Sequence, residues 1–434
     1  MKFSLAITGD SIINRRLSVY GEEKFSSLIK ILRDADVAYT QFETVIHDYN
    51  GKGVYPAAVS GGTWMRSPRF VVDELKWMGF DILSSAGNHA MDYSYGGLFS
   101  TMNALNDVSF PFAGIGRNLG EAREPAFLET GNGRFALVST CSSFDRWAAA
   151  GETRRDVKGR PGINPLHYYY VVDSETINQL KVVGSKMGFQ ILENGKVWLF
   201  IHPTNFNKVH KFVVGDDPGV YYEAEDMDIE GNIRSVKDAK KQADYVLMHL
   251  HCHEMQPGKI YRPVRFVQTF ARACIDAGAD VFIQQGAHRG PGGIEIYKNK
   301  PIIYDPGDFI TMSTTVTKLP SEFYWNETYS GYGSNLRNWN ATPSEAFDAR
   351  NEAAAFPPPD IKGSVVPVCT FDGDNDLKEL RLYPITKLPG RSQVGRPMLA
   401  DVDEATNIIE YLRRMSSAYG TDVEFKDGVG HIIL

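Results

Sequence analysis

Five polar motifs, each placed directly after an apolar run, constrain this sequence more than any other feature. They are Gly9-Asp10, Glu43, Gly87-Asn88-His89, His249-Leu250-His251-Cys252-His253 and Gly286-Ala287-His288. A short apolar run is typical of a buried strand, so each motif is expected where a strand gives way to a loop. Ligands bind at that edge of open α/β sheets. The sequence therefore predicts one site at which these side chains meet.

Strand and helix signals alternate through the first ~115 residues, which predicts a sheet covered by helices. Apolar residues at helical spacing predict a helix that contains Phe25 to Leu32. Ser67 and Pro68 look like the N-cap and first residue of a second helix. The alternation resumes after residue 242, and Asp401 with Glu404 predicts a capping box that opens a helix near the end.

Two segments interrupt this pattern. We expect residues 142–242 to form an insertion that borders the site, and the aromatic segment 314–360 to form a loop. Long loops in compact domains are often lids or binding loops, so residues 323–339 are either a substrate lid or a packed surface loop. We place 1–385 in one domain, with a C-terminal helix and hairpin, 386–434, packed on it.

Composition excludes some functions. The net charge of -7 and the pI near 5.9 argue against nucleic-acid binding, which needs a basic face. No signal peptide and no apolar stretch of ~18 residues is visible, so we expect a cytoplasmic protein without membrane insertion. The expected partner is a small-molecule or peptide substrate, and the oligomeric state is not predicted. The four cysteines lie in or beside apolar runs and are expected to be buried thiols.

The residue types at the strand ends favour metal binding. Carboxylate oxygen and imidazole nitrogen bind divalent metals, and an Asn oxygen can complete the set. Residues two apart in a strand face the same way, so His249, His251 and His253 share one face. Either all three reach the site, or only His251 does and the other two form structural hydrogen bonds.

The order and spacing of the motifs resemble the CapA family of poly-γ-glutamate biosynthesis proteins, which have a calcineurin-like metallophosphoesterase fold. The resemblance spans residues 1–309 without the 142–242 segment. It implies an α/β fold, a four-layer α/β/β/α sandwich with a metal site at the strand ends. The matching stretches are TGDSII, AYTQFETVI, SSAGNHAMDYSYGGL, GIGRNLGEAREPAFLETG, ADYVLMHLHCHE and GAHRGPGGIEIYKNKPIIYDPGDF.

The resemblance also implies a role for each matching residue. Asp10 and His288 are implied as ligands of one divalent metal, and Glu43 as a bridge to a second metal held by Asn88 and His251. The implied metal is Mn, Zn, Fe or Ca. His89 is implied as the general acid, or as a neighbour that orients the reacting group. The implied catalytic residues are Asp10, His89, His251 and His288.

The sequence also departs from the family. The usual G-H-x-P-H motif is replaced by a stretch that keeps His288 and has Gln285 where the other histidine belongs. Cys252 and His253 replace a common Trp-Gly pair, and Asp308 replaces Asn in Gly-Asn-Phe. Gln is a poor ligand for Zn or Mn, so two metals, one metal and no metal all remain open.

Three functions follow. The first is a metal-dependent hydrolase of a γ-glutamyl or other peptide-like amide, or of a phosphoester. The second is a metal-independent isomerase or epimerase of a peptide or amino-acid derivative, with Asp10 and His288 as an acid/base pair. The third is a non-catalytic accessory protein of capsule or polymer assembly. The candidate substrate-binding residues are Arg289, Arg160, His253 and Trp325.

Overall fold

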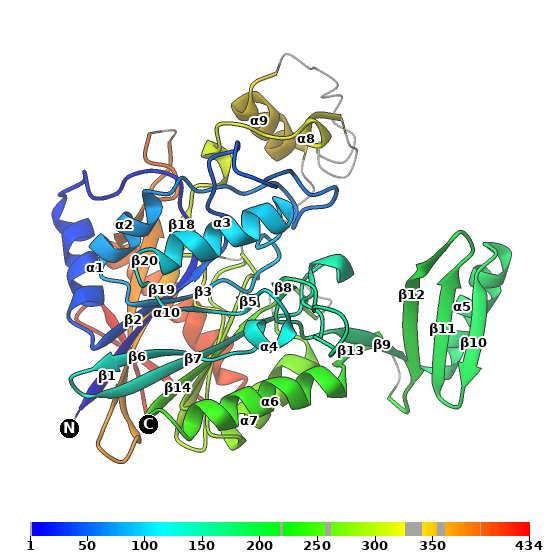
Figure 1. Cartoon of the computed structure of the whole chain (residues 1–434). Coiled ribbons are helices and arrows are strands. Elements are labelled where there is room, and N and C mark those ends of the chain that lie inside the picture. Colours follow the sequence, from blue (N-terminus) through cyan, green and yellow to red (C-terminus); the bar gives the residue numbers. More distant parts are fainter. Residues whose placement is uncertain (1, 218–219, 257–261, 326–340, 354–360, 391) are drawn as a thin grey trace.

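The computed structural model describes residues 2–217, 220–256, 262–325, 341–353, 361–390 and 392–434. Two β-sheets lie face to face, and helices cover their outer faces (Figure 1). The four-layer α/β/β/α sandwich expected from the resemblance is confirmed.

The first sheet has the order β22-β23-β20-β19-β1-β2-β3-β4, with β18 beside β1 and β21 beside β20. Strands β1 to β4 are parallel, and β19 runs antiparallel to β1. Its strands are β1 (Phe3–Ile12), β2 (Val37–Phe42), β3 (Ile82–Ser84), β4 (Phe112–Ala113), β18 (Ile310–Thr311), β19 (Ser364–Phe371), β20 (Leu377–Lys387), β21 (Pro397–Leu399), β22 (Val423–Lys426) and β23 (Val429–Ile432).

The second sheet has the order β16-β17-β15-β14-β7-β6. Strands β7, β14, β15 and β17 are parallel, so their carboxyl ends meet at one edge. Its strands are β6 (Ala126–Thr130), β7 (Gly133–Cys141), β14 (Tyr245–His251), β15 (Val281–Gln285), β16 (Ile294–Tyr297) and β17 (Lys300–Tyr304).

Alternation along each strand decides which side chains lie between the sheets. In β14, Leu247 joins the core between the sheets, whereas Met248 packs against the outer helices. His249 and His251 follow Leu247 at steps of two, so they too face the first sheet. Any site at the end of β14 must therefore form between the two sheets.

The outer layers are amphipathic helices. Buried apolar residues of α1 and α2 pack on the first sheet, and α3 extends this layer. Helices α6 and α7 cover the second sheet, and α10 packs beside the core between the sheets. The bounds are α1 (Glu23–Arg33), α2 (Val71–Met78), α3 (Ser94–Asn106), α4 (Leu119–Ala122), α6 (Asp226–Lys240), α7 (Arg265–Asp276) and α10 (Val402–Ser417).

The capping prediction for α10 is confirmed, because Asp401 and Glu404 form a capping box. The prediction for α2 is wrong at its start. That helix begins at Val71, and the Ser67 hydroxyl donates instead to the carbonyl of Ile13. Ser67 is therefore used to join two loops and not to cap the helix.

The 142–242 segment contains a separate, five-stranded sheet that projects from the sandwich (Figure 1). Its order is β10-β11-β12-β9-β13, and α5 packs on it through Ile177. Helix α6, at the end of the segment, belongs to the outer layer of the sandwich. The remaining bounds are η1 (Arg146–Ala148), β5 (Ile115–Gly116), β8 (Gly162–Ile163), β9 (Tyr168–Val172), α5 (Ser174–Lys186), β10 (Gln190–Asn194), β11 (Val197–His202), β12 (Asn205–Val214) and β13 (Val220–Ala224).

Two α-helices lie inside the segment expected to be a loop. They are α8 (Ser321–Trp325) and α9 (Pro343–Ala353), after the short turn η2 (Ser313–Thr315). Phe323 and Phe347 from these helices pack with Trp64, which explains the local order. Most of the proposed lid, residues 326–339, lies outside the described residues.

Two further expectations can be compared with the structure. Cys141, Cys252, Cys274 and Cys369 are all buried and unpaired, as expected. Among the described residues, no helix is long and apolar enough to span a bilayer.

Candidate metal centre

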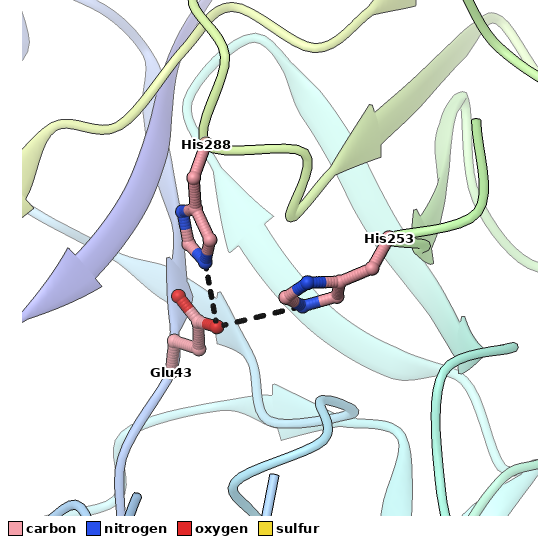
Figure 2. Close-up of side chains that lie close together, drawn as sticks. All are labelled: Glu43, His253 and His288. Carbon is pink, nitrogen blue, oxygen red and sulfur yellow. Dashed lines mark ion pairs between the residues drawn. The ribbon is translucent and has the colours of Figure 1, made fainter. Parts of the chain in front are cut away.

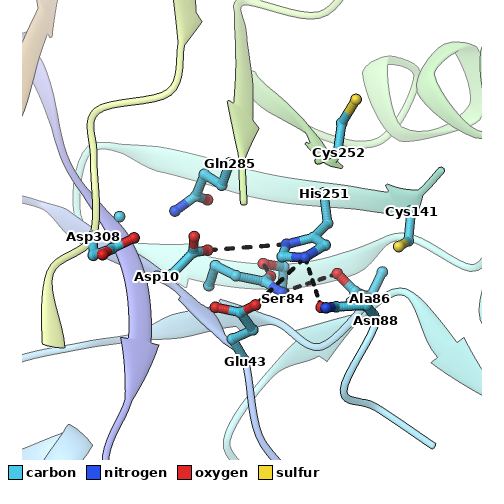
Figure 3. Close-up of polar contacts among 12 residues, drawn as sticks. Asp10, Glu43, Ser84, Ala86, Asn88, Cys141, His251, Cys252, Gln285 and Asp308 are labelled. Carbon is cyan, nitrogen blue, oxygen red and sulfur yellow. Dashed lines mark hydrogen bonds and ion pairs between the residues drawn. The ribbon is translucent and has the colours of Figure 1, made fainter. Parts of the chain in front are cut away.

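The five motifs meet between the two sheets. Asp10 lies on β1, Glu43 follows β2, and Asn88 belongs to the loop after β3. His251 ends β14, and His288 lies in the loop after β15. Figure 3 shows side chains from both sheets pointing toward one another at this edge.

One group of side chains surrounds His251. Its Nε2 lies 2.9 Å from Oδ1 of Asn88 and 2.9 Å from Nε2 of His253. The two Nε2 atoms and the amide oxygen thus lie close together. We call Asn88, His251 and His253 the histidine cluster.

A second group surrounds His288. Its Nδ1 lies 2.7 Å from Oδ1 of Asp308 and 3.9 Å from Oδ2 of Asp10. The ligand atoms of these three side chains all lie within 4.8 Å of one another. We call Asp10, His288 and Asp308 the aspartate cluster.

Glu43 lies between the two clusters. Its Oε1 is 3.6 Å from Nε2 of His251, 3.9 Å from Nε2 of His253 and 3.4 Å from Nε2 of His288. Figure 2 shows His253 and His288 both directed at this oxygen. The sequence-derived role for Glu43, a bridge, fits its position.

The buried carboxylates lack ordinary partners. Asp10 and Glu43 are 0% and 1% exposed, and none of their four carboxylate oxygens accepts a well-aligned hydrogen bond from the described residues. The Nδ1 atom of His251 is likewise buried without a hydrogen bond there. Burying polar atoms without hydrogen bonds is costly, and metal coordination is one way to offset that cost. The donor set of carboxylate, amide and imidazole therefore fits a divalent cation.

Electrostatics separate the two clusters. Burial and the neighbouring His288 lower the pKa of His253 to about 3, and burial keeps the pKa of His251 far below its usual value. Burial works against protonation of His288 too, but Glu43 and Asp308 outweigh it and raise its pKa. Burial and Glu43 together raise the pKa of Asp10. The histidine cluster thus offers neutral nitrogen ligands, whereas the aspartate cluster contains charged groups.

Asp308 has a second partner that the sequence did not reveal. Lys387 on β20 donates from Nζ to Oδ2 of Asp308 at 2.8 Å. Burial opposes ionisation, but Lys387 and His288 lower the pKa of Asp308. Asp308 thus stays charged and holds the ring of His288. The only sequence signal was Asp308 in place of the family Asn, and nothing marked Lys387.

His89 lies beside the clusters in a buried pair. Its Nδ1 is 2.6 Å from Oδ2 of Asp92, whose carboxylate also accepts from the backbone N–H groups of Gly61 and Met65. Burial disfavours protonated His89, but Asp92 outweighs it and raises the pKa. This arrangement fixes the ring and favours its protonated form, as a general acid requires.

Backbone geometry brings the loops of β15 and β17 to the site. A β-carbon on Gly286 would lie 2.8 Å from Cε1 of His251, so the close approach of this loop needs glycine. The Asp305 carboxylate accepts from the N–H groups of Ala287 and Gly307 and so joins the two loops. His288 itself has φ of 53°, an uncommon conformation that often occurs at functional sites.

Two residues at the ends of strands do not face the clusters as ligands. Gln285 accepts from the Tyr39 hydroxyl at 2.9 Å and donates to the carbonyl of Thr8 at 3.0 Å. His249 lies deeper, with Nδ1 2.9 Å from the Ser139 hydroxyl. Of the two outcomes considered for the β14 histidines, the structure shows an intermediate: His251 and His253 reach the site, and His249 has a structural contact.

Some of the candidate substrate-binding residues lie at the clusters and others do not. His253 is in the histidine cluster, and Arg289 directly follows His288. Arg160 donates to the carbonyl of Ala149 in the loop before β8, and no contact described for it reaches the clusters. Trp325 ends α8, and its side chain lies outside the described residues.

A cavity opens beside each cluster. One of about 300 Å³ is lined by Asn88 and His253 of the histidine cluster. Another of about 380 Å³ is lined by His288, Asp308 and Lys387. Each cluster therefore has residues in the lining of a cavity.

A four-layer sandwich with polar ligands at its strand ends defines a protein of the metallophosphoesterase-like fold class. The family model for the bacterial capsule synthesis protein PGA_cap matches residues 4–313. The chain belongs to this family.

Similarity to curated proteins extends over the whole chain. An uncharacterized protein of Sinorhizobium fredii, y4sH, is 32% identical over 445 residues, covering 100% of this chain and 93% of the relative. The PGA biosynthesis protein CapA of Bacillus subtilis is 23% identical over 316 residues, which cover 71% of this chain and 63% of the relative. A probable polyglutamine synthesis accessory protein of Mycobacterium tuberculosis is 25% identical over 53% of this chain and 44% of its own length.

Proposed function

We propose that this protein is a metal-dependent hydrolase whose reaction centre lies between the histidine and aspartate clusters. The observation that carries the proposal is that the four buried oxygens of Asp10 and Glu43 accept no hydrogen bond from the described residues. Another buried carboxylate of the same chain, in contrast, has hydrogen-bond partners. Glu295, 4% exposed, is held by Arg272 and Tyr304 at 2.8 and 2.7 Å.

The proposed ligands come from both clusters. Asp10, His288 and Asp308 are suited to one cation, and Asn88, His251 and His253 to another, with Glu43 between them. A bound divalent cation would act there as a Lewis acid and activate water as the nucleophile. Lys387 keeps Asp308 charged, and Asp308 orients His288.

His89 supplies the proton in this proposal. Because its Nδ1 faces Asp92, its Nε2 is the atom left to donate to the leaving group. The raised pKa favours the protonated ring that carries this proton. Asp92 in turn is held by two backbone N–H groups, so the ring cannot turn without losing its bond to a fixed carboxylate.

The proposed bond is a peptide-like amide, with a γ-glutamyl amide as the first candidate. The names of the relatives, PGA biosynthesis protein and polyglutamine synthesis accessory protein, support this choice. A phosphoester is the alternative bond, since it is the substrate that the fold class suggests.

The experiment compares both bonds in one assay. The full-length protein is stripped with a chelator, reloaded with Mn²⁺, Zn²⁺, Fe²⁺ or Ca²⁺, and given γ-glutamyl-p-nitroanilide or bis-p-nitrophenyl phosphate. We expect turnover only after reloading, and its loss in Glu43→Gln. The matched control is Glu295→Gln, which changes a buried carboxylate outside the clusters. Turnover that ignores both metal and Glu43 would contradict the proposal.

One observation favours a second candidate, acid/base isomerisation of a peptide or amino-acid derivative. His288 forms a carboxylate–imidazole pair at 2.7 Å, but its partner is Asp308, whereas Asp10 at 3.9 Å is beyond hydrogen-bonding distance. The stripped protein tests it in D₂O. Deuterium entering an α-carbon without metal would favour isomerisation, and its absence would leave hydrolysis as the better proposal. A protein inactive in both assays would support an accessory role.

A further inference from the structure

The cavity beside the histidine cluster has an unusual charge. Its lining includes Asp145 and Glu254, and no Lys or Arg is among the described residues that line it. A third acid, Asp92, is paired with His89. Two carboxylates, those of Asp145 and Glu254, thus line the cavity with no cationic side chain of Lys or Arg facing them among its described lining residues.

Neither free acid is neutralised by its closest contacts. Glu254 accepts from the hydroxyls of Ser142 at 2.7 Å and Ser143 at 2.9 Å, and both donors are uncharged. Asp145 is an exposed residue of the lining. Partial burial of its carboxyl raises its pKa, and Lys208, which does not line the cavity, opposes this shift without reversing it. A cationic ligand would complete this arrangement, and an anionic one would be repelled.

The walls add a second requirement. Phe144, Trp147 and Met91 line the same cavity of about 300 Å³ and supply apolar surface. Aromatic faces attract cations as well as apolar groups. The cavity is thus shaped for a small group that combines an apolar stem with a positive charge.

We propose that this cavity binds a primary ammonium group carried on an apolar or aromatic stem. Because Asn88 and His253 belong both to the cavity and to the histidine cluster, the bound amine lies next to the proposed reaction centre. The substrate is then an amide with a free amino group on the side that enters this cavity. That last statement rests on the proposed function, whereas the binding of an amine does not.

Three probes of similar size separate charge from shape: benzylamine, benzyl alcohol and benzoate. Trp147 is the only one of the chain's 6 tryptophans among the described lining residues, so its 19F signal in protein labelled with 5-fluorotryptophan reports on this cavity. Trp147→Phe assigns that signal. We expect benzylamine to shift it at concentrations at least roughly tenfold below those needed for benzyl alcohol or benzoate.

Charge variants test the cause. Asp145→Lys is expected to weaken benzylamine binding by roughly tenfold or more, and Asp145→Asn by less. Asp156→Lys is the matched control, since it makes the same change of charge on an exposed loop residue outside the cavity. Its affinity for benzylamine should equal that of the unmodified protein.

Two results would overturn the inference: benzoate binding as tightly as benzylamine, or an Asp145→Lys affinity equal to that of the Asp156→Lys control. The titrations are made on metal-stripped protein and repeated after reloading. Binding is measured without turnover, so a failed hydrolysis assay would not affect this result, nor would a failed titration exclude hydrolysis of another amide.

Discussion

The histidine cluster and the aspartate cluster both contact Glu43 but differ in the charge of their own side chains. In the histidine cluster, burial keeps His251 and His253 neutral. In the aspartate cluster, Asp308 is ionised against Lys387 and His288. The side chains of the histidine cluster are thus uncharged ligands. Those of the aspartate cluster belong to a network of acidic and basic groups. Two cations bound here would meet different ligands, with Glu43 as the common one.

The largest expected effect follows from changing that common ligand. Glu43→Gln keeps the shape of the side chain and removes its charge from both clusters. We expect kcat/KM for the metal-dependent reaction to fall by roughly 100- to 1,000-fold. In the metal-free protein the same change should lower the melting temperature, because it removes the carboxylate that stabilises protonated His288. An unchanged rate would show that the clusters do not act through Glu43.

A smaller effect is expected on the aspartate side alone. Lys387→Met leaves Asp308 without its cation, so His288 should be held less well. We expect kcat to fall by about 10- to 100-fold, the usual range for residues that orient metal ligands. Lys387→Arg should restore much of the activity, since it keeps a charged donor. If both variants behave alike, Lys387 has only a structural role.

The third prediction concerns how activity depends on pH through His89, which lies beside the clusters. Protonated His89 is the proposed acid, so activity should fall as pH rises through its raised pKa. Asp92→Asn removes the charge that raises this pKa, and the alkaline limb should therefore move to lower pH. Rate profiles across pH for both proteins measure the shift. Asp48→Asn, an exposed carboxylate paired with Arg66, is the control and should leave the limb in place.

The smallest effect on activity is expected at His249. It is buried on the same strand face as His251, but its contact is the Ser139 hydroxyl. His249→Phe should cost about 1–3 kcal/mol of unfolding free energy and leave kcat per folded molecule unchanged. Chemical denaturation and a rate assay test this together. A loss of activity without a loss of stability would place His249 in the reaction centre.

Much of the fold, and the set of side chains that meet between the two sheets, could be predicted from the sequence, because apolar runs and the polar residues that end them are local signals. Asp10, Glu43, Asn88, His251 and His288 each follow such a run, and the structure brings them together. The strand period also predicted that the β14 histidines share a face. The strand period does not predict how far each histidine lies from the edge of the sheet. This distance is why His253 reaches the site and His249 does not.

The missed residues depend on contacts between distant segments. Lys387 lies on β20, which pairs with β19, β21 and β23 and with none of the strands that carry the motifs. Its bond to Asp308 joins residues 79 positions apart. The order in α8 and α9 depends on Phe323 and Phe347 meeting Trp64, which no local pattern showed. The sequence pattern predicted Ser67 as a helix cap, but its hydroxyl donates a hydrogen bond to the carbonyl of Ile13. In each case a long-range contact decided the outcome.

The most direct test of the central claim, a metal centre with two unlike halves, is metal content measured cluster by cluster. The full-length protein, Asp10→Asn, His253→Gln and Glu43→Gln are reloaded with Mn²⁺ or Zn²⁺, desalted and analysed for bound metal. We predict that Asp10→Asn and His253→Gln each lose about half of the metal, and that Glu43→Gln loses most of it. Equal metal content in all four proteins would contradict the account.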